Sequence, residues 1–167
     1  MRSRLLLAIF LVLPALPVCA DGVGGAFGGG RTQFSLVAGN SQAFNKSYVV
    51  FGGSASYYMV DGLGIGLSAE KWSGDGPDIT KYAPFVQYVF YQVPGLQPYI
   101  GGFYRQTTIE GLPSIKSTGT RAGVLMKTGS NAFLSVGMVY ESYLDCQETV
   151  YRVCRESFPD IKVIFSF

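Results

Sequence analysis

Hydrophobic and polar residues alternate with a period of two along most of the chain from residue 31 onward. In one segment, for example, Val49 and Phe51 fall on one face of an extended strand and Ser54 on the other. A period of two is that of a β-strand, and no stretch has a convincing helical stripe. The pattern therefore predicts an all-β protein. The predicted strands are residues 31–42, 47–60, 62–73, 79–92, 97–109, 114–128, 131–144 and 157–167.

The length and the faces of these strands favour a membrane barrel. Each is ten residues or longer, whereas a membrane-crossing strand needs about 9–11 residues and ordinary strands have about 5–6. One face carries bulky apolar residues, and the other carries glycine, serine and a few isolated charges. A bulky face turned to lipid around a narrow interior explains this division. A soluble periplasmic ligand-binding barrel, with its large apolar residues inside, is the alternative.

The connections between the predicted strands alternate in length. Tight turns occur at 61–62, 94–95 and 127–131, and the other connections lie at 43–46, 74–78, 110–113 and 145–156. Outer-membrane barrels have short periplasmic turns and longer outside loops, so this alternation predicts eight strands with both ends periplasmic. Aromatic residues near the strand ends would form the two interfacial girdles. These are Tyr57, Tyr82, Phe90, Tyr104, Tyr140 and Phe165.

Residues 1–20 have the pattern of a secretory signal peptide. Two arginines precede an apolar run, and Val18 and Ala20 stand three and one residues before the predicted cleavage. A transmembrane anchor is the alternative, but the run is shorter than the ~20 residues of a spanning helix and prolines interrupt it. A lipoprotein would use Cys19, although Val18 stands where that signal has a small residue. We expect residues 21–30 to form a flexible Gly-rich periplasmic tail with too little side chain to pack, and residues 31–167 to form the barrel.

Charge and composition exclude several functions. The chain has 13 basic and 11 acidic residues, and removal of Arg2 and Arg4 with the signal leaves 11 of each. No cationic face for nucleic acid is then left. The chain has no histidine, so it lacks the usual general base and the commonest metal ligand. The glycines at 22–30 and 62–66 lack the residues that complete a nucleotide-binding motif, and we predict no cofactor.

The signal, the eight amphipathic strands and the final segment Ile161-Lys-Val-Ile-Phe-Ser-Phe167 together resemble the small eight-stranded outer-membrane β-barrels of Gram-negative bacteria, of the OmpX-like and OmpA transmembrane-domain type. The resemblance covers residues 31–167 and is one of pattern. It implies an antiparallel up-and-down transmembrane barrel, and it implies that the outer-membrane assembly machinery reads Phe165 and Phe167. We expect no peptidoglycan-binding domain of the OmpA type.

A set of charged residues is predicted to point into the barrel. An eight-stranded barrel is just wide enough for side chains to fill, so such charges must form ion pairs or hydrogen bonds. We interpret them as a structural plug of salt bridges. The alternative is a gate that rearranges to pass small ions, as proposed for the barrel that this chain resembles. The set comprises Glu70, Arg105, Arg121, Glu141 and Lys162.

Cys146 and Cys154 flank the middle of the longest predicted outside loop. An even number of cysteines in a secreted chain favours a disulfide. We interpret the disulfide as a structural restraint on the loop. The functional alternative is that it also presents a recognition surface. Metal binding by two cysteines without histidine is weak, and we predict no metal. The recognition residues would be Glu148, Tyr151, Arg152 and Arg155.

These observations lead to one functional hypothesis. We predict a monomeric, non-enzymatic integral protein of the Gram-negative outer membrane that contributes to envelope architecture or surface interaction. A narrow ion or solute channel is the alternative. Its partners would be outer-membrane lipid, lipopolysaccharide, the assembly machinery and a host or surface ligand. No catalytic residues are assigned.

Overall fold

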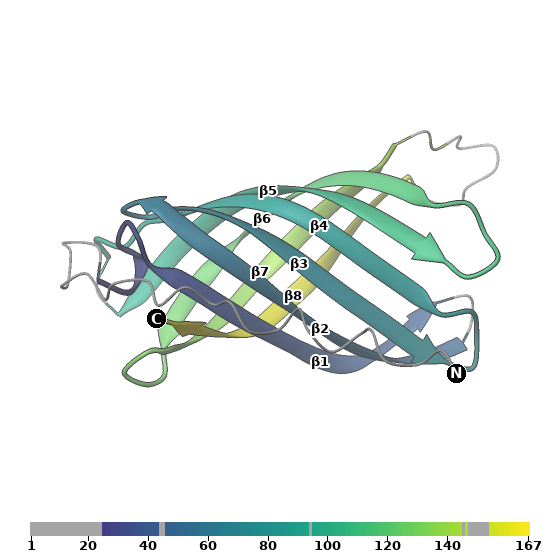
Figure 1. Ribbon diagram of the computed structural model, residues 1–167, viewed down its shortest axis with the longest axis horizontal. Helices are drawn as coiled ribbons and strands as arrows, with labels where there is room; N and C mark the ends of the chain where they lie inside the picture. Colours follow the sequence, from purple (N-terminus) through teal and green to yellow (C-terminus); the bar gives the residue numbers. More distant parts are fainter. Residues whose placement is uncertain (1–24, 44–45, 94, 145, 147–153) are drawn as a thin grey trace, which may run out of the picture.

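Eight antiparallel strands form a closed barrel, in which each strand pairs with its neighbours in sequence and the last strand returns to the first (Figure 1). The structure is a computed structural model, and it describes residues 25–43, 46–93, 95–144, 146 and 154–167. All eight predicted strands are present, with ends that differ by three residues or fewer. They are Thr32–Ala43 (β1), Lys46–Val60 (β2), Leu63–Gly74 (β3), Ile79–Val89 (β4), Leu96–Ile109 (β5), Ile115–Lys127 (β6), Ala132–Tyr143 (β7) and Arg155–Ser166 (β8).

The alternation along the strands divides the side chains as the sequence predicts. Val49 and Phe51 on β2 point outward and are 63% and 65% exposed, whereas Tyr58 points inward and is fully buried. All six predicted girdle aromatics lie on the outside. Among the described residues, no helix is long and apolar enough to cross a membrane. Bulky apolar side chains such as those of Val49 and Phe51 thus cover the outer wall of the barrel.

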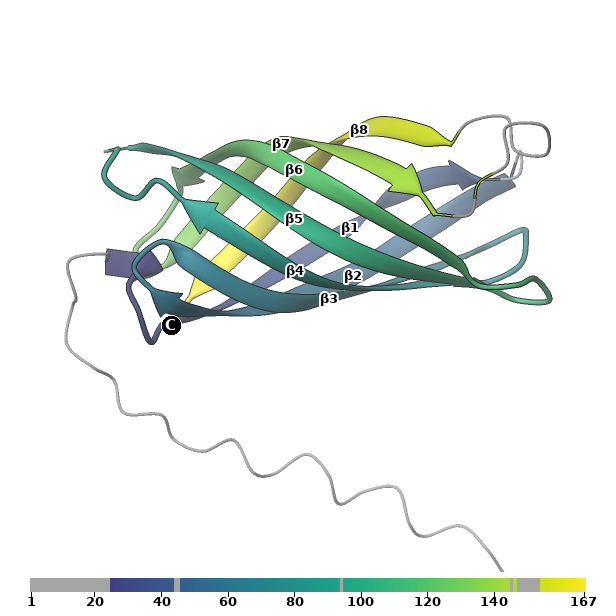
Figure 2. The same cartoon turned by 90° about the horizontal axis from the view of Figure 1, so that it is seen from above.

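The end of the barrel with the β2–β3, β4–β5 and β6–β7 connections, called here the inner end, is filled by apolar side chains. The predicted alternation of connection lengths is wrong, because the β4–β5 connection at this end has six residues and the β1–β2 connection at the outer end has two. A single 3-10 turn, Gly25–Phe27 (η1), lies across this end (Figure 2). Phe27 is 1% exposed and packs on Tyr58 and Phe133, with ring centroids 5.8 and 5.0 Å away. We call the following seven residues the inner plug. Its members are Phe27, Tyr58, Val89, Tyr99, Leu125, Phe133 and Ile164.

The prediction that residues 21–30 cannot pack is wrong for residues 25–30. One aromatic side chain suffices, because backbone hydrogen bonds hold the segment around it. The Gly62 N–H donates to the Phe27 carbonyl at 2.8 Å, and the Gly30 N–H donates to the Tyr58 carbonyl at 2.7 Å. The Ala26 carbonyl accepts hydrogen bonds from Gln33 and from the hydroxyl of Ser166. Residues 21–24 lie outside the described residues.

Two glycines make room for the inner plug. Gly62, in the turn between β2 and β3, has a φ of +80°, which favours glycine. Gly64 faces inward, and a Cβ there would lie 3.3 Å from the Tyr58 ring. Gly64 thus acts as a small inward-facing residue of β3, whereas Gly62 belongs to the turn.

The pairing that closes the barrel is short. β1 pairs with β2 over its whole length, from Thr32 to Ala43. Its register with β8 runs only from Gln33 to Leu36, opposite Ser166 to Val163. Beyond this point the two strands diverge toward the outer end (Figure 1). The wall is therefore continuous in its inner half and has a less tightly joined seam in its outer half.

Candidate functional site

A cavity of about 460 Å³ occupies the outer half of the barrel. Its wall combines charged residues with aromatic ones, and two of its lining residues near the outer end, Asn40 and Glu156, are exposed. We call this cavity the chamber. Its charged lining residues are Glu70, Lys81, Arg105, Arg121, Glu156, Asp160 and Lys162.

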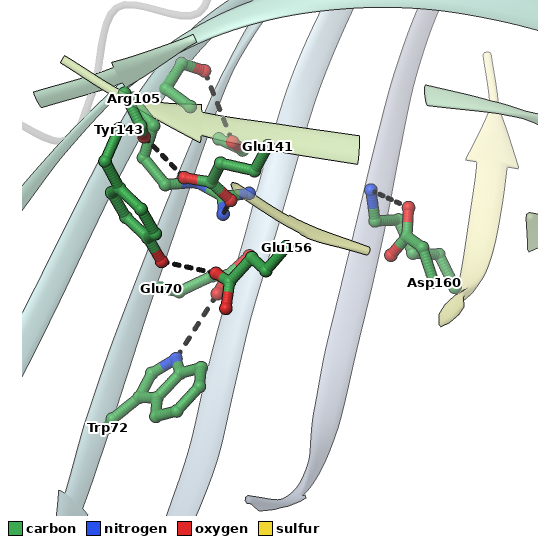
Figure 3. Close-up of polar contacts among 11 residues, drawn as sticks. Glu70, Trp72, Arg105, Glu141, Tyr143, Glu156 and Asp160 are labelled. Carbon is green, nitrogen blue, oxygen red and sulfur yellow. Dashed lines mark hydrogen bonds and ion pairs between the residues drawn. The ribbon is translucent and has the colours of Figure 1, made fainter. Parts of the chain in front are cut away.

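The most buried ionic contact in the barrel wall joins Arg105 of β5 to Glu141 of β7. The Arg105 guanidinium donates to the Glu141 carboxylate, which also accepts a hydrogen bond from the hydroxyl of Ser117 (Figure 3). The side chains of Arg105 and Glu141 are 11% and 2% exposed. Both charges are therefore neutralised inside the wall, as buried charges must be.

A second ion pair lies on β8. The Lys162 ammonium is 2.7 Å from the Asp160 carboxylate. These residues are two positions apart on the same strand, and both face the chamber. The two charges cancel locally without help from another strand.

Near the outer end, aromatic residues contact the remaining charges. The indole N–H of Trp72 donates to Glu70 at 3.3 Å, and the Lys81 ammonium lies 3.9 Å from the centre of the same indole ring. The hydroxyl of Tyr143 donates to Glu156, which lines the chamber together with Glu70 and Trp72 (Figure 3). Trp72 therefore contacts both signs of charge at the chamber wall.

Arg121 of β6 lies at the floor of the chamber, where it also lines a smaller cavity of about 20 Å³ beneath it. It donates one hydrogen bond, to the side-chain oxygen of Gln87 at 3.1 Å. Its guanidinium lies 4.2 Å from the centre of the Phe85 ring. Within the described part of the chain, no carboxylate is within ion-pair distance of Arg121. Gln87 in turn donates to the hydroxyl of Tyr58, so the floor of the chamber connects directly to the inner plug.

The structure places all five predicted interior charges inside the barrel. It brings Arg105 and Glu141 together, whereas Glu70 and Arg121 make no ion pair with another described residue. The predicted set of interior charges lacks three charged residues that line the chamber, Lys81, Glu156 and Asp160. The alternation indicates that Lys81 faces inward, because its neighbour Tyr82 faces outward. The predicted connection 145–156 includes Glu156, but β8 begins at Arg155, so Glu156 is a strand residue.

The outer loop contains the predicted disulfide between Cys146 and Cys154, whose Cα atoms are 5.6 Å apart. Of the predicted recognition residues, only Arg155 is described, and it is exposed at the start of β8. Glu148, Tyr151 and Arg152 lie outside the described residues.

The predicted assembly signal lies at the inner end. Phe165 faces outward on β8, and Phe167 is exposed just after it. The backbone of Phe167 exchanges hydrogen bonds of 3.1 and 2.9 Å with Thr32, and its ring is 6.1 Å from that of Phe34. The last residues of the sequence thus join the first strand of the barrel.

Comparison with known proteins gives structural matches only. Neither a protein-family model nor a curated protein sequence matches the chain. The N-terminal β-barrel domain of Pseudomonas aeruginosa OprF superposes with a TM-score of 0.62 at 18% identity, over 84% of this chain and 99% of that one. The chain has the fold of the small outer-membrane β-barrels. Neisserial surface protein A (NspA) has the same fold, with a TM-score of 0.51 at 13% identity, over 80% of this chain and 92% of that one.

Proposed function

We propose that this small outer-membrane β-barrel is a non-enzymatic, non-conducting integral protein that acts in envelope architecture or at the cell surface. The observation that carries the proposal is the unequal filling of the barrel. Buried apolar side chains fill the inner end, whereas the outer half holds the chamber, with a smaller buried apolar cluster of Tyr48, Ile79 and Ile109 beside it. Such a barrel presents a surface and a blind chamber to the outside.

The outer wall supports the proposed membrane insertion. Bulky apolar residues such as Phe51 and Leu67 are more than half exposed on the strands, and contiguous apolar surface of this kind needs lipid or a partner. Outer-membrane lipid and lipopolysaccharide are therefore the proposed partners of the wall, and the protein is proposed to act as a monomer.

The non-enzymatic role is supported by the residue types. The sequence contains no histidine, and among the described residues no cluster of three or more Cys, Asp or Glu side chains could hold a metal ion. The charges around the chamber engage one another and nearby aromatic rings. This arrangement supports a structural role for most of them.

Envelope fractionation tests the location. We expect the protein in the outer-membrane fraction, released only by detergent, with a gel mobility that changes on heating. Release by osmotic shock without detergent would instead identify a soluble periplasmic barrel.

The chamber charges favour one second candidate, a narrow ion or solute channel. Planar-bilayer recording separates it from the proposal. We expect no steady conductance, because the inner plug fills the barrel. Steady conductance that changes in Glu141→Ala or Arg121→Ala would establish the channel.

Assembly through the final residues is proposed from the exposed Phe165 and Phe167. Deletion of Phe167 should reduce the amount of folded protein in the outer membrane, with Phe167→Tyr as the aromatic control. Normal insertion of the deleted chain would remove the assembly role.

A further inference from the structure

Arg121 is a buried cation whose hydrogen-bond donors are not all used. It is 8% exposed, and a guanidinium has five N–H donors. One of them reaches Gln87, and the Nε atom has no hydrogen-bond partner among the described residues. Arg105, in the same chamber, is paired with Glu141. Since a buried charge without a partner is costly, Arg121 is placed to bind an oxyanion, which can accept two of its hydrogen bonds.

The chamber also reaches the side of the barrel. Asn40 and Pro159 occupy outward positions on β1 and β8, as the exposure of their neighbours Ala38 and Ile161 shows, yet both line the chamber. They lie on the lengths of β1 and β8 that are beyond the last registered pair, Leu36 with Val163. The seam between the two strands is thus a lateral opening of the chamber.

The opening begins at the level of the lipid-facing wall. Ala38 and Ile161 are apolar and point outward on the two diverging edges, and Ile161 is 59% exposed. Sheet edges do not face hydrocarbon unless they line a polar cavity, and the chamber supplies that cavity. An apolar chain could pass between these edges, from the lipid to the chamber.

We propose that the chamber binds a small amphiphile from the outer leaflet, with an oxyanion headgroup on Arg121 and its hydrocarbon chain in the opening between β1 and β8. Phe85, Phe103 and Phe158 supply apolar contacts within the chamber. Its volume of about 460 Å³ lies in the range of about 300–1,000 Å³ that is usual for ligand sites. The inference rests on the proposed membrane location, which fractionation tests separately.

Trp72 provides the readout, because it is the only tryptophan of the sequence and lines the chamber. Folded protein in a non-ionic detergent is titrated with a decanoate that carries bromine beside its carboxylate. We expect saturable quenching of Trp72 fluorescence. The apparent affinity should fall about tenfold or more in Arg121→Gln, because a hydrogen bond to a charged group contributes about 1.5–3 kcal/mol. Lys116→Gln, with the same change of charge at an exposed position of β6 outside the chamber, should bind as the native protein does.

Competitors identify the headgroup. Unbrominated decanoate and decyl phosphate test carboxylate and phosphate as sources of the oxyanion, and methyl decanoate is the uncharged control. Reversal of quenching by either anion but not by the ester supports the proposal and names the preferred headgroup. Equal competition by the ester, or quenching unchanged in Arg121→Gln protein that keeps its heat-modifiable mobility, would overturn it.

Cysteine pairs test the opening. Leu36→Cys with Val163→Cys occupies the last registered pair of β1 and β8 and should form a disulfide on oxidation. Ala38→Cys with Ile161→Cys lies one step outward on the same faces and should remain reduced. Equal cross-linking of the two pairs would show a closed seam and overturn the lateral route.

Discussion

The inner and outer halves of the barrel share one wall but enclose different interiors. In the inner half, Phe27, Tyr58 and Phe133 pack as in a globular core. In the outer half, Glu70, Lys81 and Lys162 surround a cavity of about 460 Å³. The outward-facing residues do not differ in this way between the two halves, since apolar side chains face outward in both.

This difference shows that separate physical requirements determine the residues of the wall and the residues of the interior. Lipid requires bulky apolar side chains on the outside at every membrane level. The interior only has to be filled or internally neutralised, and either solution is compatible with the same eight strands. A functional site can therefore occupy one half while the other half stabilises the fold.

The largest effect should come from removing one partner of the buried ion pair in the outer half. Glu141→Ala leaves Arg105 and Ser117 without their acceptor, and loss of one member of a buried pair costs about 3–5 kcal/mol. Urea unfolding in detergent measures this loss. Glu156→Ala is the matched control, because Glu156 is exposed, and it should cost about 1 kcal/mol or less. Equal losses would show that burial does not distinguish the two carboxylates.

A somewhat smaller loss is expected at the inner plug. Phe27→Ala removes the ring that packs on Tyr58 and Phe133, and large-to-small changes of a buried phenylalanine cost about 3–5 kcal/mol. We expect the low end of this range, because a three-residue turn can shift to fill part of the space. Phe34→Ala, on the outward face nearby and 44% exposed, should cost less in the same unfolding assay. If the two variants are equally stable, the plug does not act as a core.

The outer disulfide should contribute an intermediate amount. Cys146 and Cys154 are eight positions apart, and a ring of that size stabilises by about 2–3 kcal/mol in the chain-entropy model. Cys146→Ser with Cys154→Ser should lower the free energy of unfolding accordingly. A reducing agent should destabilise the native protein but not this variant. A native protein insensitive to reduction would contradict the prediction.

The smallest effect is expected on the outer surface. Lys71 and Asp78 form an ion pair of 3.1 Å in which both side chains are substantially exposed. Such pairs contribute about 0–1 kcal/mol and are screened by salt. Lys71→Gln should therefore change the unfolding midpoint slightly at low salt and hardly at all at high salt. A loss comparable to that of Glu141→Ala would mean that the exposed ion pair contributes as much to stability as the buried pair of Arg105 and Glu141.

The sequence predicts the wall better than the interior. Alternation identifies strands and lipid-facing residues such as Phe51 and Ile161, because one rule acts at every position of the wall. It also places Glu141 and Arg121 inside. It does not predict which of them pairs, because pairing depends on the register between strands, and a period of two carries no information about register.

Two other features escape the pattern for different reasons. Phe27 lies in a Gly-rich segment without periodicity, and its burial depends on backbone contacts to Gly62 and on side chains far along the chain. The short register between β1 and β8 depends on the relative shift of the first and last strands. Neither is a local property of the residues concerned.

The contact between the Ala26 carbonyl and the Ser166 hydroxyl spans 140 positions of sequence, and it has a consequence for the order of assembly. The N-terminal turn η1 is synthesised before every strand, yet its hydrogen-bond donors include a residue of β8, the last strand to be made. Pairing of Thr32 with Phe167 completes the inner wall at the same place. Sealing of the inner end and arrival of the final strand are therefore a single late event, so a partly assembled chain would be both unsealed and open along its side.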